Sequence, residues 1–158
     1  MDEAFRGIDA SDLSIALEVS LPFSELILRR VKSVETRVYP IAQCLIGVKI
    51  LLLQSQENTS LQSSLGNLIP SSADGTHDGL VVIGSIVVSE CYQYRDWNHW
   101  DSEREQHQVP KDSKFEMKEG DREDCAPRWA WKIAEAVPLH DFARPALSRV
   151  YRSVFRIY

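Results

Sequence analysis

Three charged residues, Lys32, Glu35 and Arg37, form the part of the sequence best suited to chemistry. In an extended chain, residues two apart point the same way, so Glu35 and Arg37 share one face. Twist or a bulge before them could bring Lys32 to that face. The cations could contact phosphate, and a Lys–Glu pair could exchange protons with a substrate. The alternative is an edge strand whose solvated Glu35–Arg37 pair contributes about 0.2–1 kcal/mol. In both cases we expect these three residues, the charged motif, to contribute little to folding stability.

Two tryptophans provide a second candidate feature in the irregular segment of residues 94–126. Trp97 and Trp100 lie there among many charges. Aromatic rings in a polar loop can stack on bases, and each such contact is worth about 1–3 kcal/mol. The alternative is that both rings pin the loop onto the protein core. We predict that the charged motif borders a cleft that residues 94–107 also reach, with Trp97, Trp100 and Arg30 as further ligand-binding residues.

Positive charge is concentrated in two parts of the chain, although the formal net charge is −5. Non-specific coating of nucleic acid needs many Lys and Arg side chains, and the net charge therefore argues against it. The basic clusters consist of Arg29, Arg30, Lys32 and Arg37, and of Arg144, Arg149, Arg152 and Arg156. This distribution favours a local anion or nucleotide site over a long nucleic-acid track.

The charged motif follows a segment, residues 21–30, that is typical of a short helix. Pro22 suits the first helical position, and apolar residues recur at three- and four-residue spacing after it. Strands are expected on both sides of this unit and in the second half of the chain, over residues 13–20, 47–53, 79–88 and 129–133. Residues 150–158 are interpreted as a closing strand, with a helix as the alternative. We also expect Trp129 and Trp131 to share one face of their strand and to lie in the core.

These elements predict an α+β, mainly β fold. The expected architecture is a small, partly closed β-barrel of about six strands with one or two short helices. A chain of 158 residues can bury a sizeable core as one domain. We expect a single domain over residues 12–158 after an N-terminal tail of residues 1–11, with long loops at 54–78 and 94–126.

Composition excludes several classes of protein. With 44% hydrophobic and 26% charged residues, the chain is an ordinary folded protein. No apolar run approaches the ~20 residues that span a bilayer, and the N-terminus is acidic, so we expect an intracellular protein of the cytoplasm or nucleus. Cys44, Cys91 and Cys125 are far apart and the four histidines are scattered. We therefore expect no metal, no cofactor and no membrane partner, and we expect a monomer.

The order of elements around the charged motif resembles the ASCH domain family, a branch of the PUA-like folds. The resemblance lies in a Pro-started helix, the Lys-x-x-Glu-x-Arg sequence and a strand introduced by Gly47. Residues 79–88 look like the family's long central strand with its internal glycine. Residues 129–133, followed by Pro138, look like its late aromatic strand. The resemblance covers roughly residues 12–158. It implies a PUA-like β-barrel and binding of RNA or a nucleotide.

Some small ASCH proteins are amidohydrolases that deacylate N-acylated cytidine, so the resemblance leaves the question of an enzyme open. In that type it implies a Lys at the start of the motif, a Thr three residues on and a Glu from elsewhere. Lys32 matches the Lys, but the Thr position is Glu35, and Thr36 is one residue away and faces the opposite side of an extended strand. Candidates for the remaining carboxylate are Glu90, Glu103 and Glu105.

Two hypotheses therefore remain, from different classes of function. In a binding module, Lys32 and Arg37 would contact phosphate, Glu35 would accept hydrogen bonds from a base or ribose, and a tryptophan would stack. In a small hydrolase that acts on a modified nucleoside or on RNA, Lys32 and Glu35 would form the acid/base pair.

Overall fold

A computed structural model describes residues 15–55, 79–118, 127–143 and 145–158. Seven strands form one sheet: β1 (Ile15–Ser20), β2 (Val34–Arg37), β3 (Lys49–Ser55), β4 (Leu80–Gln93), β5 (Trp129–Ala143), β6 (Leu147–Tyr151) and β7 (Val154–Ile157). The helices are short: α1 (Phe23–Leu28), a 3₁₀ turn η2 (Gln43–Leu45), α3 (Trp97–Ser102) and α4 (Arg104–His107). The expected tail of residues 1–11 and most of the expected loop 54–78 lie outside the described residues.

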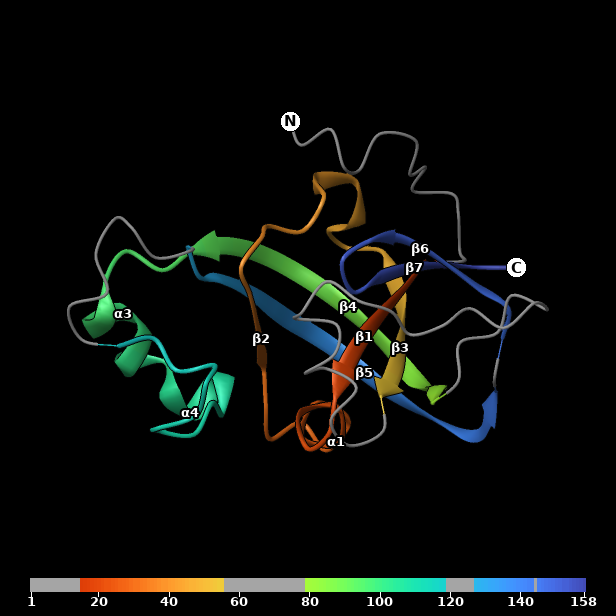
Figure 1. Ribbon diagram of the computed structural model, residues 1–158, viewed down its shortest axis with the longest axis horizontal. Coiled ribbons are helices and arrows are strands. Elements are labelled where there is room, and N and C mark those ends of the chain that lie inside the picture. The colour runs from red at the N-terminus through yellow and green to blue at the C-terminus, as the bar shows by residue number, and fades with distance from the viewer. Residues whose placement is uncertain (1–14, 56–78, 119–126, 144) are drawn as a thin grey trace.

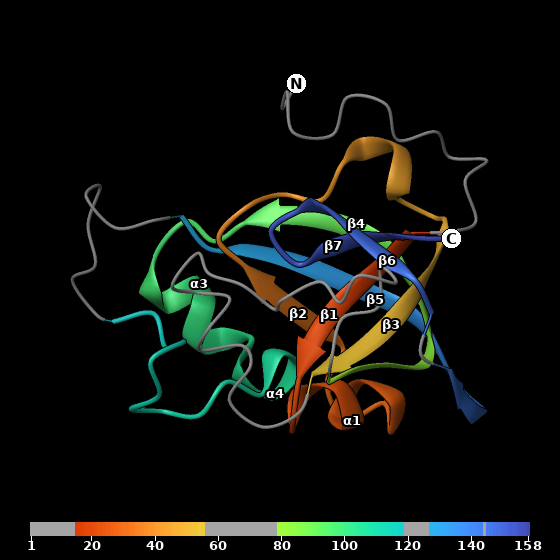
Figure 2. The ribbon, with the colours of Figure 1, turned by 45° about the vertical axis from the view of Figure 1, so that its right-hand side comes forward.

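The sheet has the strand order β2-β5-β4-β3-β1-β7-β6. β1 and β3 are parallel, and all other neighbours are antiparallel. The long strands β4 and β5 run diagonally through the molecule and carry the shorter strands on either side (Figure 1). Their pairing shifts register near Gly84 and near Val88. Such bulges increase the bend and twist of a strand. The sheet accordingly curls into a partly closed barrel (Figure 2).

The curl brings the two edges of the sheet towards each other. β2 lies at one edge and the β6–β7 hairpin at the other. Nevertheless, Arg37 on β2 donates to Ser153 Oγ in the hairpin turn at 2.7 Å, and to the carbonyl oxygen of Glu18 on β1 at 2.7 Å. One arginine side chain therefore bridges the opening of the barrel. The charged motif lies at this junction.

The core fills the inside of the curl. Ile15, Leu17 and Val19 alternate along β1 and join the largest buried cluster, as their spacing predicts. Trp131 is 1% exposed in the same cluster, as expected, and Trp129 is partly buried and packs against that cluster. Ala16, on the other face of β1, packs with Leu53 and Phe155 in a second cluster. Strand β1 is therefore buried on both faces, which explains its apolar sequence.

Gly84 allows helix α1 and strand β5 to approach the central strand closely. A Cβ atom at this position would lie 2.6 Å from the carbonyl oxygen of Val137 and 2.7 Å from Leu28 Cδ2. Both distances are far below van der Waals contact, so only glycine fits here without rearrangement. This requirement gives a physical reason for the internal glycine in a strand that is otherwise rich in Val and Ile.

The fold agrees with the sequence-based expectation in class and differs from it in three elements. The protein is mainly β with short helices and a PUA-like, partly closed sheet. The expected closing strand 150–158 is instead the hairpin β6–β7, because the chain reverses at Arg152, whose φ is 45°. The segment expected as a loop after residue 94 contains α3 and α4. Strand β5 runs ten residues beyond the predicted end at residue 133.

Candidate functional site

The charged motif begins where the end of α1 turns into β2. The backbone N–H groups of Val31 and Lys32 both donate to the carbonyl oxygen of Leu26, at 2.9 and 3.0 Å, which closes the helix. Arg30 adopts a positive φ of 59° in this turn. The turn swings Lys32 onto the side of Glu35, as the sequence allowed. Lys32 Nζ lies 3.3 Å from Glu35 Oε2, and Arg37 Nη2 lies 2.9 Å from Glu35 Oε1.

Lys32 and Glu35 of the motif are buried, whereas the sequence suggested charges that line a cleft or face solvent and contribute little to folding. Lys32 is 2% exposed and Glu35 is 7% exposed. Burial lowers the pKa of Lys32, and the neighbouring carboxylate of Glu35 opposes this shift. One carboxylate thus holds two cations away from water. Removing one partner of such a cluster is strongly destabilising, because it leaves charge without compensation.

Helix α4 fixes the position of the Lys32 ammonium. Lys32 Nζ donates to the carbonyl oxygen of His107 at 2.5 Å, and Ser33 N donates to the carbonyl oxygen of Gln106 at 2.9 Å. The His107 ring is buried, and its Nδ1 accepts a hydrogen bond from Val109 N at 3.0 Å. The proton of the neutral ring is therefore on Nε2, which lies 3.1 Å from the Trp100 carbonyl oxygen. Burial lowers the pKa of His107 to about 4. A neutral histidine therefore locks the turn that presents its own carbonyl to Lys32.

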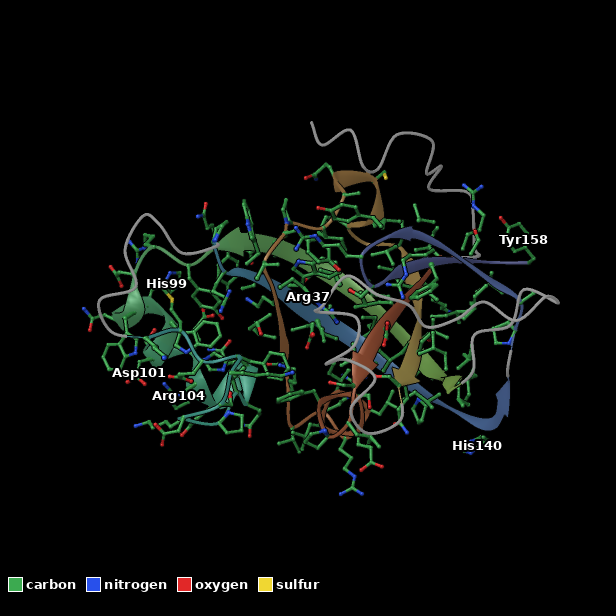
Figure 3. The ribbon with its side chains drawn as sticks, in the orientation of Figure 1. Arg37, His99, Asp101, Arg104, His140 and Tyr158 are labelled. Carbon is green, nitrogen blue, oxygen red and sulfur yellow. The ribbon has the colours of Figure 1, made fainter. Side chains whose placement is uncertain are left out.

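Arg37 is held by three acceptors and borders the opening of the barrel. In addition to Glu35, it donates to Ser153 Oγ and to the Glu18 carbonyl oxygen. Ser153 Oγ also shares a 2.5 Å hydrogen bond with the hydroxyl of Tyr39. Burial acts to lower the pKa of Arg37, but the attraction of Glu35, Tyr39 and Glu18 outweighs it and raises the pKa. Arg37 therefore stays charged and fixed in place. In Figure 3, Arg37 lies beside β2 on the side of β1.

A pocket of about 770 Å³ opens over the charged motif. This volume lies within the range of small-molecule sites. The charged motif and Glu18 form the more buried part of its lining, the floor, and four further basic residues form the more exposed part, the rim: Lys114, Arg128, Arg149 and Arg152. Aromatic rings of Phe23, Tyr39 and Phe115 complete the lining. The pocket therefore has six basic side chains against two carboxylates, in a chain of net charge −5.

The other predicted ligand-binding residues lie away from this pocket. Trp100 is fully buried and packs against Tyr94 at a ring-centroid distance of 5.0 Å, so it pins its segment to the core and offers no face for a base. Neither Trp97 nor Arg30 lines the pocket; Arg30 instead donates to the Ala136 carbonyl oxygen at 3.4 Å. The charged motif does border a cleft, but residues 109, 114 and 115 reach it in place of residues 94–107.

The candidate carboxylates for a catalytic role also lie elsewhere. Glu103 accepts hydrogen bonds from Tyr92 and Tyr94, and Glu90 lies 3.8 Å from Lys132 on the surface. Neither they nor Glu105 lines the pocket. Its second carboxylate is that of Glu18, which sequence reasoning did not select. A charged residue in the otherwise apolar run of residues 15–19 was the signal for it.

Histidine and cysteine positions give no metal centre in the described part of the chain. No group of three His, Cys, Asp or Glu side chains converges there. His99 lies on α3 and His140 on the far arm of β5, well apart in the molecule (Figure 3). Among the described residues, no helix is long and apolar enough to cross a membrane.

Comparison with solved structures identifies the type of fold. The fold resembles that of a solved ASCH protein from Zymomonas mobilis, with a TM-score of 0.57 and 13% identity over 91% of this chain and 87% of that one. The chain has an ASCH-type fold. A tyrosine-to-phenylalanine variant of the same protein matches with a TM-score of 0.56 and 13% identity over 91% of this chain and 89% of that one. A serine-to-alanine variant matches with a TM-score of 0.57 and 12% identity over 93% of this chain and 89% of that one.

Sequence comparisons add nothing to this structural likeness. No protein-family model matches the chain, and no curated protein matches it. At 13% identity, the likeness to the Zymomonas mobilis protein concerns the ASCH fold alone. What the pocket binds must therefore be argued from the residues that line it.

Proposed function

We propose that this protein binds a nucleotide or a short segment of single-stranded RNA in the pocket over the charged motif. The observation that carries the proposal is the excess of cations in a pocket of about 770 Å³ within an acidic protein. A local positive site on a negative molecule selects compact anions and repels long polyanions. The ASCH-type fold supports the same reading by analogy, because the family is associated with RNA and nucleotide binding.

Three kinds of contact are available to such a ligand. Arg149 on β6 and Arg152 in the β6–β7 turn are both exposed, so their guanidinium groups can pair with phosphate oxygens. Phe23 and Phe115 pack edge to face at a centroid distance of 6.0 Å and give the pocket an apolar wall for a base or ribose. The charged motif supplies fixed hydrogen-bonding groups at the floor. These roles replace the expected stacking on Trp97 and Trp100.

Titration of a short single-stranded RNA, followed by fluorescence anisotropy, tests this proposal. We expect saturable binding that weakens about tenfold or more in the double variant Arg149→Gln, Arg152→Gln, because two charge-assisted contacts are lost. The matched control is Arg29→Gln, which removes an exposed arginine that follows the last residue of α1 and does not line the pocket. Equal affinities for the double variant, the control and the unaltered protein would contradict the proposal.

A hydrolase remains a second candidate, favoured by the contact between Lys32 and Glu35. Burial lowers the pKa of Lys32 beside a carboxylate 3.3 Å away, an arrangement suited to proton transfer. In amide hydrolysis, Glu35 would take a proton from an attacking water as the C–O bond forms. Lys32 would give a proton to the departing amine as the C–N bond breaks, and Glu35 would then return a proton to Lys32. Release of cytidine from N-acetylcytidine by the purified protein is the direct assay, and Glu35→Gln is expected to abolish it.

A further inference from the structure

The positive charge of the pocket is concentrated at its rim. The floor is close to neutral, because its two cations, Lys32 and Arg37, lie beside two carboxylates. The four cations of the rim, by contrast, form no ion pair with any carboxylate of the described residues. The charge that a ligand meets is therefore the charge of the rim, and the buried floor is occupied with its own ion pairs.

The rim is assembled from three parts of the chain. Lys114 lies after α4, Arg128 immediately precedes β5, and Arg149 and Arg152 belong to the β6–β7 hairpin. Cations that converge on one pocket repel one another, and a pocket lined by one sign of charge attracts the opposite sign. The rim therefore favours a ligand that carries several negative charges close together.

Aromatic rings hold two of the rim arginines in place without neutralising them. The guanidinium of Arg149 lies 4.6 Å from the ring centroid of Phe155 and donates to the carbonyl oxygen of Arg152. The guanidinium of Arg152 lies 5.3 Å from the Tyr39 centroid and 5.5 Å from the Tyr151 centroid. A guanidinium has five N–H donors, so both groups keep donors for phosphate oxygens. Because the rings already orient them, less side-chain freedom is lost when a phosphate binds.

The concentration of charge at the rim distinguishes between kinds of nucleotide. An RNA strand carries a single negative charge per nucleotide, spread along its length. A pocket of about 770 Å³ has the volume of a site for one small ligand, so an internal segment of RNA would bring few charges to the rim. A nucleoside di- or triphosphate has its charges on adjacent phosphates. Such a chain of phosphates can contact several rim cations at once, while the base lies against Phe23 and Phe115.

We propose that the pocket binds the 5′-polyphosphate of a nucleoside, with the phosphates at the rim and the base against the aromatic wall of Phe23 and Phe115. The inference rests on the proposed nucleotide binding and adds the class of nucleotide. Aromatic rings stack on every base, so the phosphates and not the base edge determine the affinity. The same chemical group occurs on free nucleoside di- and triphosphates and at the 5′ end of triphosphorylated RNA.

Calorimetric titration with adenosine 5′-mono-, di- and triphosphate, in buffer with EDTA so that no magnesium masks their charge, tests the inference. Base and ribose are constant in this series, and only the number of phosphates changes. We expect the affinity to rise about fivefold or more with each added phosphate, because each contacts a further rim cation. Inorganic tripolyphosphate is expected to bind about fivefold or more weakly than adenosine triphosphate, since it has no base to place against the aromatic wall.

The double variant Arg149→Gln, Arg152→Gln tests whether the rim holds the phosphates. It removes two of the four rim cations at exposed positions. We expect the gain in affinity from the mono- to the triphosphate to shrink to about fivefold or less, and the control Arg29→Gln to keep the full gain. An unchanged gain in the double variant would overturn the assignment of the phosphates to the rim.

A short RNA with a 5′-triphosphate, compared with the same RNA with a 5′-hydroxyl, distinguishes the two sources of the group. Tighter binding of the triphosphorylated RNA than of adenosine triphosphate assigns the pocket to an RNA end, and weaker binding assigns it to a free nucleotide. Equal affinities of the three adenosine nucleotides, of the two RNAs, or of tripolyphosphate and adenosine triphosphate overturn the polyphosphate inference and leave the proposed function standing. Failure of every nucleotide and of both RNAs to bind overturns both.

Discussion

At the scale of single residues, burial gives the charged motif a role in folding stability as well as in the pocket. The sequence predicts which residue types could do chemistry, and the structure brings Lys32, Glu35 and Arg37 together within ion-pair distance. The sequence does not show that Lys32 is 2% exposed, because its covering groups come from α4, about 75 positions later in the chain. A lysine that is buried with a carboxylate is part of the folded core as well as of the pocket. Both roles have measurable consequences.

Lys32→Ala is expected to destabilise the protein by about 3 kcal/mol, since it opens a cavity and leaves a buried carbonyl without its donor. Lys132→Ala is the matched control, because the Lys132 side chain is 52% exposed and its pair with Glu90 is a surface pair. The control is expected to change stability by less than about 1 kcal/mol. Chemical denaturation of both variants measures the difference. Similar values for the two would show that Lys32 is solvated.

His107 is expected to make folding stability depend on pH in the acidic range. Its folded-state pKa of about 4 lies below the ordinary value of 6.5, because of burial and the nearby cations Lys32 and Arg104, although Glu116 and the Trp100 carbonyl act in the opposite sense. Between these two pH values the unfolded chain binds more protons than the folded protein. Stability therefore falls as the pH is lowered from 6.5 to 4, by up to about 3 kcal/mol.

The variant His107→Gln isolates this contribution. Glutamine keeps a side-chain acceptor for the Val109 N–H but does not titrate. We expect the free energy of unfolding of the variant to fall less steeply than that of the unaltered protein over the same pH range, in parallel urea titrations. Identical slopes would mean that His107 is not held neutral in the folded state.

At the scale of elements, the sequence predicts the helices and strands that have a clear local pattern, but not those whose conformation depends on contacts with distant residues. The helix after Pro22 and the strands β1, β3 and β4 follow from apolar spacing, and Gly47 and Gly79 mark the starts of β3 and β4. The β6–β7 reversal escapes such reasoning because Arg152, not Gly or Asn, occupies its left-handed position. Helix α3 has an N-cap signal, since Asp96 accepts from His99 N at 2.8 Å, but its charged sequence lacks a clear apolar period.

The rim of the pocket was beyond sequence reasoning for the same reason. Arg149 and Arg152 are recognisable as part of a basic cluster near the C-terminus. Their place beside β2 depends on the curl of the whole sheet, which joins residues more than 100 positions apart through the Arg37–Ser153 hydrogen bond. Local pattern contains no information on that closure. Sequence therefore predicts the floor of the site and only the charge of its rim.

Gly84→Ala tests the packing of α1 and β5 on the central strand. The added methyl group would lie 2.6 Å from a backbone oxygen of β5 and 2.7 Å from Leu28, so we expect a loss of stability of about 1–3 kcal/mol from overpacking. Ser89→Ala, at an exposed position of the same strand, is the control and should have a small effect. Thermal denaturation distinguishes the two. An unchanged melting temperature for Gly84→Ala would show that β5 and α1 can move apart freely.

At the scale of the whole molecule, an acidic protein concentrates positive charge in one pocket. Few phosphates can be neutralised at once in a site of this volume, and the rest of the surface repels a polyanion. The affinity for short RNA should therefore be modest and should fall gently with salt, with a logarithmic slope of about −2 to −3 for single strands. Titrations at several salt concentrations measure this slope. A steep slope would indicate a long phosphate track and would contradict a local site.

The most direct measurement of ligand binding in the pocket is a map of backbone amide chemical shifts during titration with a short single-stranded RNA. Binding over the charged motif predicts that shifts concentrate at residues 35–39, at residues 114–115 and around the hairpin turn of Arg152 and Ser153, with little change at α3. Shifts centred on Trp97–Ser102, or no shifts at saturating RNA, would contradict a binding site in this pocket.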